Sequence, residues 1–358
     1  MLLHDLELHG FRSYRDLQVT FAPGVTVLVG DNAQGKTNLL EAVGWLATLS
    51  SFRGATDDAL VNLDADQAIV RANGTRDQRA LLLEAEINRS GRNRTLVNRQ
   101  PLRRTRDLLG ALRVTVFAPD DLELVKQGPG LRRRFVDDAL VAVNPARDVV
   151  RTEVDRVLRQ RNALLKQAKA RLSPEIAATL DVWDAKLAEA GTALADARAD
   201  LVAQVAPVLT ESYASLAGGG RVATIRYEPP WRTAGLAAAL QEARGDDVRR
   251  GVTTVGPHRD DVELSLSDSP ARTHASQGEQ RTFALALRLA SHRVVTDATG
   301  SAPILLLDDV FSELDASRRA ALLANLPHGQ TLLTTAADVP EGTHPDLVLH
   351  VAEGTITR

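Results

Sequence analysis

The chain has 358 residues, of which 44% are hydrophobic and 25% charged, as in ordinary globular proteins, and it is long enough for two packed lobes. It has no cysteine, which excludes a disulfide framework and a thiolate metal site, and no apolar run of roughly 18 residues to span a bilayer. A formal net charge of −3 excludes bulk attraction to nucleic acid, so any such contact needs a local basic patch. Asp5 and Glu7 interrupt the first apolar run, unlike a signal peptide, and we expect a cytoplasmic protein.

The first third of the chain predicts a mixed α/β arrangement. Alternating apolar residues at 2–8 and 17–21 predict two strands joined by a polar turn, and the β-branched run at 25–29 predicts a buried strand. A helix is expected at 38–49, and further strands are expected at 68–72, 80–87 and 114–117.

Long helices are expected from about residue 131. A heptad series predicts that one helix packs against a neighbour, with its two sets of apolar positions at Leu180, Leu187, Leu194, Leu201 and Val208 and at Trp183, Ala190 and Ala197. With the helical stretch at 149–170, this predicts an antiparallel hairpin, although an ordinary helical subdomain fits as well. Strands return at 222–227 and 262–267. We therefore expect an α/β domain at 1–118 and 252–358, interrupted by a mainly helical lobe at 119–251.

A phosphate-binding loop follows the buried strand at 25–29. The pattern G-x-x-x-x-G-K-[ST] between a strand and a helix is typical of nucleoside triphosphate sites, because its amides and the helix N-terminus face an anion. Lys36 is expected on the β- and γ-phosphates, and the Thr37 hydroxyl on Mg²⁺. The expected ATP-binding residues are Gly30, Asp31, Asn32, Ala33, Gln34, Gly35, Lys36, Thr37 and Asn38.

An apolar strand at 303–309 ends in two carboxylates. We expect Asp308 to hold Mg²⁺ together with Thr37, and Asp309 to act as the general base on the attacking water. Plain sheet architecture would explain such a strand less well once a phosphate loop is present.

A third motif opens the helix that begins near residue 277. Ser276 and Glu279 fit a capping box, which is a purely structural explanation. The cap does not need Gly278, which costs about 0.5–1 kcal/mol relative to alanine. We interpret the glycine as room for a phosphate near the backbone, and expect a nucleotide role for Ser276, Gln277, Gly278, Glu279 and Gln280.

Two arginine clusters are candidate DNA contacts. Residues 89–106 hold seven arginines and no acid, and residues 132–134 are all arginine. Because the chain has 38 arginines, many are expected to be merely solvated. The candidates are Arg99, Arg103, Arg104, Arg106, Arg132, Arg133 and Arg134.

The three nucleotide motifs together resemble the ATP-binding-cassette superfamily. Lys36 and Ser276 are 240 residues apart, which resembles the SMC-like group, with its helical insertions, more than a transporter cassette. Within that group the chain is similar to the RecF family of bacterial recombination mediators. The segments that carry this similarity are 10–14, 27–32, 34–41, 117–122, 132–137, 256–261, 276–281 and 307–315.

This resemblance implies an ABC-type ATPase head (an α/β P-loop NTPase fold) with an inserted helical lobe. It implies a protein that binds ATP with Mg²⁺, dimerises around two nucleotides, and binds double-stranded and gapped DNA. RecR and RecO would be partners, and RecA loading would be the outcome. Arg12 and Ser13 would reach the phosphates, residues 276–280 would act in trans, and a loop of Glu313, Leu314 and Asp315 would couple the two sites. The roles of His258 and Arg259 stay open.

Two departures from the cassette pattern bear on turnover. Asp309 stands where glutamate is usual and is shorter by one methylene, which predicts slow hydrolysis suited to a switch. The resemblance implies that this weak ATPase activity depends on DNA. Thr335 stands where a histidine is common and is a weak candidate for a γ-phosphate contact. The alternatives are a transporter ATPase subunit, a structural SMC-type tether and an SMC-like nuclease. The sequence shows no further cluster of histidines and carboxylates for the second metal of a nuclease.

Overall fold

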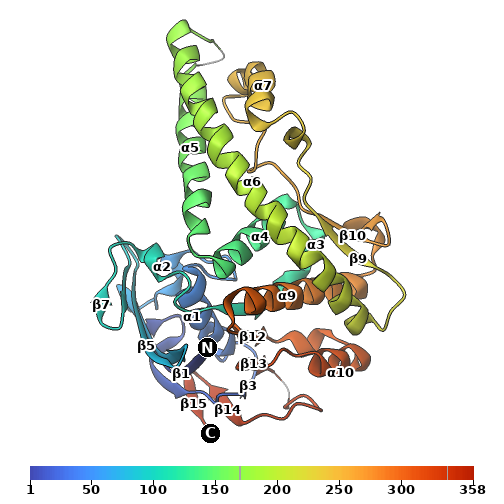
Figure 1. Ribbon diagram of the computed structural model, residues 1–358. Coiled ribbons are helices and arrows are strands. Elements are labelled where there is room, and N and C mark those ends of the chain that lie inside the picture. The colour runs from blue at the N-terminus through green and yellow to red at the C-terminus, as the bar shows by residue number, and fades with distance from the viewer. Residues whose placement is uncertain (169–170, 337) are drawn as a thin grey trace. The chain divides into compact units, whose positions relative to one another are not determined.

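The computed structural model describes residues 1–168, 171–336 and 338–358, which form two compact units (Figure 1). The first unit comprises Met1–Leu122, Glu211–Val222 and Ser276–Arg358, and the second comprises Glu123–Thr210 and Ala223–Ala275. Segment 252–275, which we expected in the ATPase head, belongs to the second unit because its strand β10 pairs with β9. Among the described residues, no helix is both long and apolar enough to cross a bilayer.

A mainly parallel sheet forms one half of the first unit. Its order is β15-β14-β3-β13-β12-β8, with only β15 antiparallel to its neighbour. Every residue of β12 and β13 is buried, as expected for a sheet that is covered on both faces. The strands are β3 (Val25–Val29), β8 (Val114–Phe117), β12 (Ile304–Asp308), β13 (Thr331–Thr335), β14 (Leu347–Ala352) and β15 (Thr355–Thr357).

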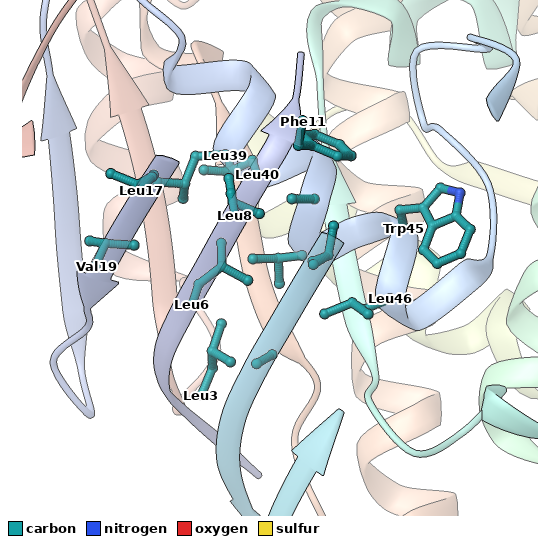
Figure 2. Packing of buried hydrophobic residues seen from close by; sticks show 14 of the residues in the cluster. Leu3, Leu6, Leu8, Phe11, Leu17, Val19, Leu39, Leu40, Trp45 and Leu46 are labelled. Carbon is teal, nitrogen blue, oxygen red and sulfur yellow. The ribbon is translucent and has the colours of Figure 1, made fainter. Parts of the chain in front are cut away.

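An antiparallel sheet forms the other half. Its order is β2-β1-β4-β5-β6-β7, built from β1 (Leu2–Phe11), β2 (Tyr14–Thr20), β4 (Gln67–Arg76), β5 (Arg79–Asn88), β6 (Arg94–Val97) and β7 (Gln100–Pro101). Helix α1 (Lys36–Thr48) contributes to one hydrophobic core with both sheets. Figure 2 shows Leu39 and Leu40 of α1 close to Leu8 of β1, and Leu46 and Trp45 of α1 in the same core. The strands and helix expected in this region are confirmed.

Short helices and one long helix complete the first unit. They are α2 (Asp57–Leu60), α9 (Gln277–Thr299) and α10 (Ala316–Ala324), with 3₁₀ turns η1 (Thr105–Leu108), η2 (Pro119–Asp121) and η4 (Val310–Glu313). The 23-residue α9 extends well beyond the apolar stretch that marks it in the sequence, and its later part exposes the polar residues Arg293 and Asp297.

The second unit is mainly helical, as expected. It contains α3 (Leu122–Lys126), α4 (Pro129–Val143), α5 (Arg147–Ala168), most of α6 (Pro174–Ala217), η3 (Pro230–Arg232), α7 (Leu236–Arg250) and α8 (Ala271–His274), with a sheet of β9 (Ala223–Arg226), β10 (Glu263–Leu266) and β11 (Ser269–Pro270). Helices α5 and α6 run antiparallel as a hairpin (Figure 1). The helix end expected at Ala170 lies outside the described residues.

The buried face of α6 differs from the predicted heptad pattern. The leucines of the first series are buried, as is the expected Ala197, but Trp183, Ala190 and Val208 are only half-buried. A further buried series lies one residue after the second expected set, at Asp184, Gly191, Arg198 and Val205. Two of these positions are charged, and a search for apolar spacing passes over them. A Cβ on Gly191 would lie 2.5 Å from Leu236 Cδ2, so the glycine permits close packing of α7.

Buried arginines tie the helices of the second unit together. Arg161 of α5 is fully buried and donates to Asp184 Oδ1 at 2.6 Å and Asp247 Oδ2 at 2.7 Å. Arg198 of α6 binds both carboxylate oxygens of Asp137 at 2.8 Å. Both pairs span elements far apart in sequence, so each fixes the relative position of two helices.

The segment 256–261 is a packing junction inside this unit. Asp260 accepts hydrogen bonds from Tyr227 Oη at 2.7 Å and Trp231 Nε1 at 2.8 Å, while Asp261 accepts two from Arg132 at 2.8 Å. Burial lowers the pKa of His258 to about 4, so the ring is neutral at physiological pH. These contacts explain most of the segment through packing and leave Arg259 and Asp261 exposed, Asp261 with its carboxylate on Arg132.

Candidate nucleotide site

The candidate site lies at the carboxyl edge of the parallel sheet in the first unit. Strands β3, β13 and β12 are neighbours there, with Thr334 paired to Leu28 on one side and to Asp308 on the other. Because the strands are parallel, the loops that follow Val29, Asp308 and Thr335 all leave from the same edge. The fold therefore brings together the phosphate loop and the two aspartates, which are more than 270 residues apart in sequence.

The phosphate loop has the geometry of an anion cradle. Gly35 stands at the N-cap of α1 with φ = 111°, a left-handed conformation that favours glycine. Lys36 Nζ donates to the carbonyl oxygens of Gly30 at 2.5 Å and Asp31 at 2.7 Å. Burial lowers the pKa of the Lys36 ammonium, while the charges of Asp309, Asp308 and Asp31 oppose that shift. An anion at this helix end would therefore meet free amide dipoles and a partly desolvated cation.

Two hairpins hold the loop in place. Tyr14 Oη, in the first hairpin, donates to the Gly35 carbonyl at 3.0 Å, and burial raises the pKa of this phenol. At the other end of the chain, the Glu353 amide donates to Gln34 Oε1 at 2.6 Å. The sequence alone predicted no role for Tyr14 or Glu353. Only their position in turns that adjoin the loop reveals that they restrain it.

Residues suited to a magnesium ion meet next to the phosphate loop, where α1 begins and β12 ends. Thr37 Oγ1 donates to Asp308 Oδ1 at 2.8 Å, and Thr334 Oγ1 donates to the same oxygen at 2.9 Å. Burial raises the pKa of Asp308, and the two hydroxyl hydrogen bonds oppose that shift. A hydroxyl and a carboxylate oxygen at this separation are the hard ligands that Mg²⁺ prefers in nucleotide sites. The donor set therefore fits the expected ion, and the juxtaposition of Thr37 with Asp308 is the one predicted.

Asp309 has an unusual backbone conformation. Its φ is 48°, in the left-handed region, and its amide donates to Thr334 Oγ1 at 3.0 Å. The left-handed turn makes the chain leave the strand sharply after Asp308, and strained conformations of this kind occur at functional sites. Thr334, which the sequence analysis overlooked, thus orients both aspartates. The carbonyl oxygen of Thr335 accepts a hydrogen bond from the Gly30 amide at 3.3 Å. The predicted contact of Thr335 with the γ-phosphate stays a prediction.

The first hairpin places Arg12 and Ser13 beside the loop. Arg12 forms a two-pronged ion pair with the buried Glu41 of α1, at 2.8 Å for each bond. Ser13 Oγ accepts from Asn38 Nδ2 at 2.9 Å. Arg53 was not singled out from the sequence, yet its charge opposes the rise in the pKa of Asp308 that burial causes, and its guanidinium lies 3.5 Å from Asn38 Oδ1. The predicted reach of Arg12 to the phosphates stays a prediction.

Residues 276–280, called the signature segment from here on, form the expected capping box. Glu279 N donates to Ser276 Oγ at 3.3 Å, and Ser276 N donates to Glu279 Oε2 at 2.7 Å. Ser276 and Gln277 are exposed, whereas Gln280 is buried. The residues of the expected coupling loop lie just before α10, where Leu314 is buried and Asp315 is the N-cap. The side chain of Glu313 lies outside what the structure describes.

The arginine clusters differ in exposure. In the first cluster Arg99, Arg103 and Arg104 are exposed, and Arg106 is half-buried. In the second cluster only Arg134 is exposed, since Arg132 is buried against Asp261 and Arg133 donates to the Asp260 carbonyl at 2.6 Å. A buried guanidinium paired with a carboxylate is not free for a DNA phosphate, so we leave Arg132 out of the DNA surface proposed below.

Comparisons with known proteins agree with this geometry. Residues 2–336 match the family model described as the RecF/RecN/SMC N terminal domain. The "DNA replication and repair protein RecF" of Streptomyces avermitilis is 46% identical over 99% of this chain and 98% of its own length. The protein of the same name from Cutibacterium acnes is 43% identical, over 95% and 94%.

Solved structures extend the comparison to the fold. A structure of the recombination mediator protein RecF with ATP in the RecFOR pathway has a TM-score of 0.91 and 28% identity, over 99% of this chain and 97% of that one. A Pyrococcus furiosus Smc head domain shares the fold, with a TM-score of 0.58 and 18% identity over 99% of this chain and 95% of its own. The chain is therefore an SMC-like ABC-type ATPase in fold, and it belongs to the RecF family.

Proposed function

We propose that the chain is a DNA-binding switch of recombinational repair and replication, in which ATP joins two copies into a clamp. The observation that carries this proposal is the carboxyl edge of the parallel sheet, where Lys36, Thr37 and Asp308 form a site that fits Mg-ATP. ATP-bound structures of relatives and their names support it. The nucleotide would bind along Gly30–Asn38, with Arg12 and Ser13 at its edge.

Two groups of one copy would receive the γ-phosphate held by the other. Ser276 and Gln277 are exposed at the N-terminus of α9, where hydroxyl and amide donors can face an anion from outside the chain. Leu314 and Asp315 lie beside this turn and, with Glu313, would couple the two sites. Because ADP lacks the γ-phosphate, the dimer would be stable with ATP and weak with ADP.

Turnover would be slow and would reset the clamp. Mg²⁺, held by Thr37 and Asp308, would neutralise charge on the β- and γ-phosphates. Asp309 would accept the proton of the attacking water, and Lys36 would offset the charge that develops on the phosphates. The carboxylate of Asp309 is one methylene shorter than the glutamate usual in cassette ATPases, which places the base less well. DNA stimulation of this weak activity is part of the proposal.

Replacing Ser276 with arginine is expected to abolish ATP-dependent dimers without reducing ATP affinity, because the added bulk and charge stand where the partner's nucleotide would dock. Sedimentation velocity with ATP, together with ATP binding measured at low protein concentration, tests both parts. Gln204, exposed on α6, provides a control as Gln204→Arg. A Ser276→Arg variant that dimerises with ATP like the wild type would rule out the trans contact.

DNA would bind through phosphates, with RecO and RecR as protein partners and RecA loading as the outcome. The exposed Arg99, Arg103 and Arg104, with Arg106, form the proposed surface, to which the exposed Arg134 is a further candidate. Binding through phosphates releases counterions, so it is expected to be salt-sensitive and weakly sequence-dependent.

Changing Arg103, Arg104 and Arg106 together to glutamine is expected to weaken duplex binding in the presence of ATP. The slope of log K against log salt should become shallower by about 0.9 for each DNA phosphate that the variant no longer neutralises. Fluorescence anisotropy over a salt series measures this slope. A matched triple change at the exposed Arg226, Arg249 and Arg250 should leave it unchanged. An unchanged slope in the first triple variant would remove this cluster from the DNA surface.

A further inference from the structure

Arg318 of α10 lies against the signature turn of α9. Its guanidinium is held by Asp315, whose Oδ2 accepts from Nη1 at 2.6 Å. The same carboxylate caps α10 by accepting the Arg318 backbone amide at Oδ1, at 2.9 Å. These bonds lower the pKa of Asp315, so it stays ionised, and the Arg318 side chain remains about one-third exposed.

The guanidinium fills the space that a side chain at residue 278 would occupy. A Cβ built on Gly278 would lie 2.8 Å from Arg318 Nη1, 3.1 Å from Nη2 and 3.2 Å from Cζ. Any residue with a Cβ would therefore push the guanidinium away from the helix. Gly278 is within the first turn of α9 and does not have a positive φ, so its backbone conformation alone does not require glycine.

This contact revises the reason for the glycine. From the sequence we interpreted Gly278 as room for a phosphate near the backbone, but the group that occupies this space is a cation of the same copy. A cation beside the positive end of a 23-residue helix is unfavourable in isolation. Arg221 adds a second cation, paired with Glu279 at 3.0 Å. Each cation is paired with one carboxylate, Arg318 with Asp315 and Arg221 with Glu279, and an anion at the helix end would bring a further negative charge to both.

We propose that Arg318 binds the γ-phosphate that the nucleotide of a second copy presents to the Ser276 turn, and that residue 278 is glycine to leave room for Arg318. The inference rests on the proposed ATP-dependent dimer and adds a positively charged group to it. A guanidinium can hold Asp315 and a phosphate oxygen at once, because its donors lie on three nitrogens. The link also joins the coupling loop to the nucleotide of the partner copy.

A double-mutant cycle tests this assignment. Arg318→Gln removes the guanidinium charge but keeps the backbone amide that donates a hydrogen bond to Asp315, so the cap of α10 is preserved. We expect this variant to bind ATP like the wild type in the monomer, and to raise the dimer dissociation constant with ATP by about tenfold or more, as for loss of one charge-assisted bond. Gly278→Ala should have a similar effect alone. In the Arg318→Gln background, Gly278→Ala should raise the dissociation constant little further, because the guanidinium that it would displace is already absent.

Sedimentation equilibrium with ATP gives each dissociation constant, with Arg293→Gln, an exposed arginine further along α9, as the matched control. If Gly278→Ala raised the dimer dissociation constant by the same factor in the wild-type and Arg318→Gln chains, the phosphate would approach the glycine itself. Wild-type dimerisation in Arg318→Gln would also overturn the inference, while loss of dimers in Ser276→Arg left the proposed function intact. Absence of ATP-dependent dimers in the wild-type chain would refute the proposed function and this inference with it.

Discussion

Replacing Lys36 with alanine is expected to reduce ATP affinity about a hundredfold. The Lys36 ammonium is the cation aimed into the phosphate loop, where it now donates to the carbonyls of Gly30 and Asp31. Hydrogen bonds between charged groups contribute about 1.5–3 kcal/mol each, and two of them to phosphate oxygens, taken at the lower end of this range, correspond to about a hundredfold in affinity. Isothermal titration with a slowly hydrolysed ATP analogue measures the change.

The effect of Lys36→Ala can be separated from a loss of fold. Its side chain is almost fully buried near the carboxylates of Asp308 and Asp309, so thermal unfolding should be followed in the same samples. Lys126→Ala, an exposed lysine on α3, is the matched control and should bind ATP like the wild type. A folded Lys36→Ala variant with near-normal ATP affinity would refute the assignment of the phosphate loop.

Replacing Arg161 with alanine is expected to lower the free energy of unfolding of the second unit by about 3–5 kcal/mol. The guanidinium is fully buried between α5, α6 and the end of α7, and it also donates to Thr253 Oγ1 at 2.8 Å. Without it, the carboxylates of Asp184 and Asp247 remain in a low-dielectric interior with much less compensation, which is the costly part of the change. Urea denaturation followed by circular dichroism measures the loss.

Arg156 of the same helix provides the comparison for Arg161. It pairs with Glu153 at the surface, so Arg156→Ala removes the same side chain from an exposed position and should change stability little. Equal effects of the two substitutions would mean that the buried cluster does not hold the helices together. ATP binding by Arg161→Ala should survive where the first unit stays folded, because that unit contains all residues of the nucleotide site.

Local patterns in the sequence were sufficient to predict most of the strands, helices and nucleotide motifs of the first unit. The strand before Gly30, the strand that ends at Asp308 and the capping box of Ser276 each depend on neighbouring residues, so spacing and residue type reveal them. The contact between Thr37 and Asp308 could be predicted because both motifs end strands of one parallel sheet. Such strand ends meet at one edge, whatever the chain does between them.

Contacts that depend on tertiary packing could not be predicted in this way. Arg161 and Arg198 are indistinguishable in sequence from the solvated arginines around them, and only the positions of Asp137, Asp184 and Asp247 in space make them core residues. For the same reason the sequence did not reveal the buried series of α6 that lies one residue after the second predicted set, in which Ala197 alone is buried. The buried face of α6 includes charged side chains, those of Asp184 and Arg198.

The signature glycine shows both sides of this limit. From its position in a first helical turn we predicted that a phosphate comes close to the backbone at Gly278, which stays a prediction, and the sequence did not indicate that the Arg318 guanidinium lies there. Arg318 is 40 residues further along the chain and reaches Gly278 only because the Asp315 cap orients the start of α10. Thr334 is a similar case, since its hydroxyl reaches Asp308 only through the register of β12 with β13.

The most direct test of the proposed function is sedimentation velocity of the wild-type chain with ATP, with ADP and without nucleotide, each with and without gapped duplex DNA. The proposal predicts a monomer without nucleotide and with ADP, a dimer with ATP, and a DNA-bound species that forms strongly only with ATP. The same sedimentation coefficient in all three nucleotide conditions, with DNA binding unaffected by ATP, would contradict an ATP-dependent clamp.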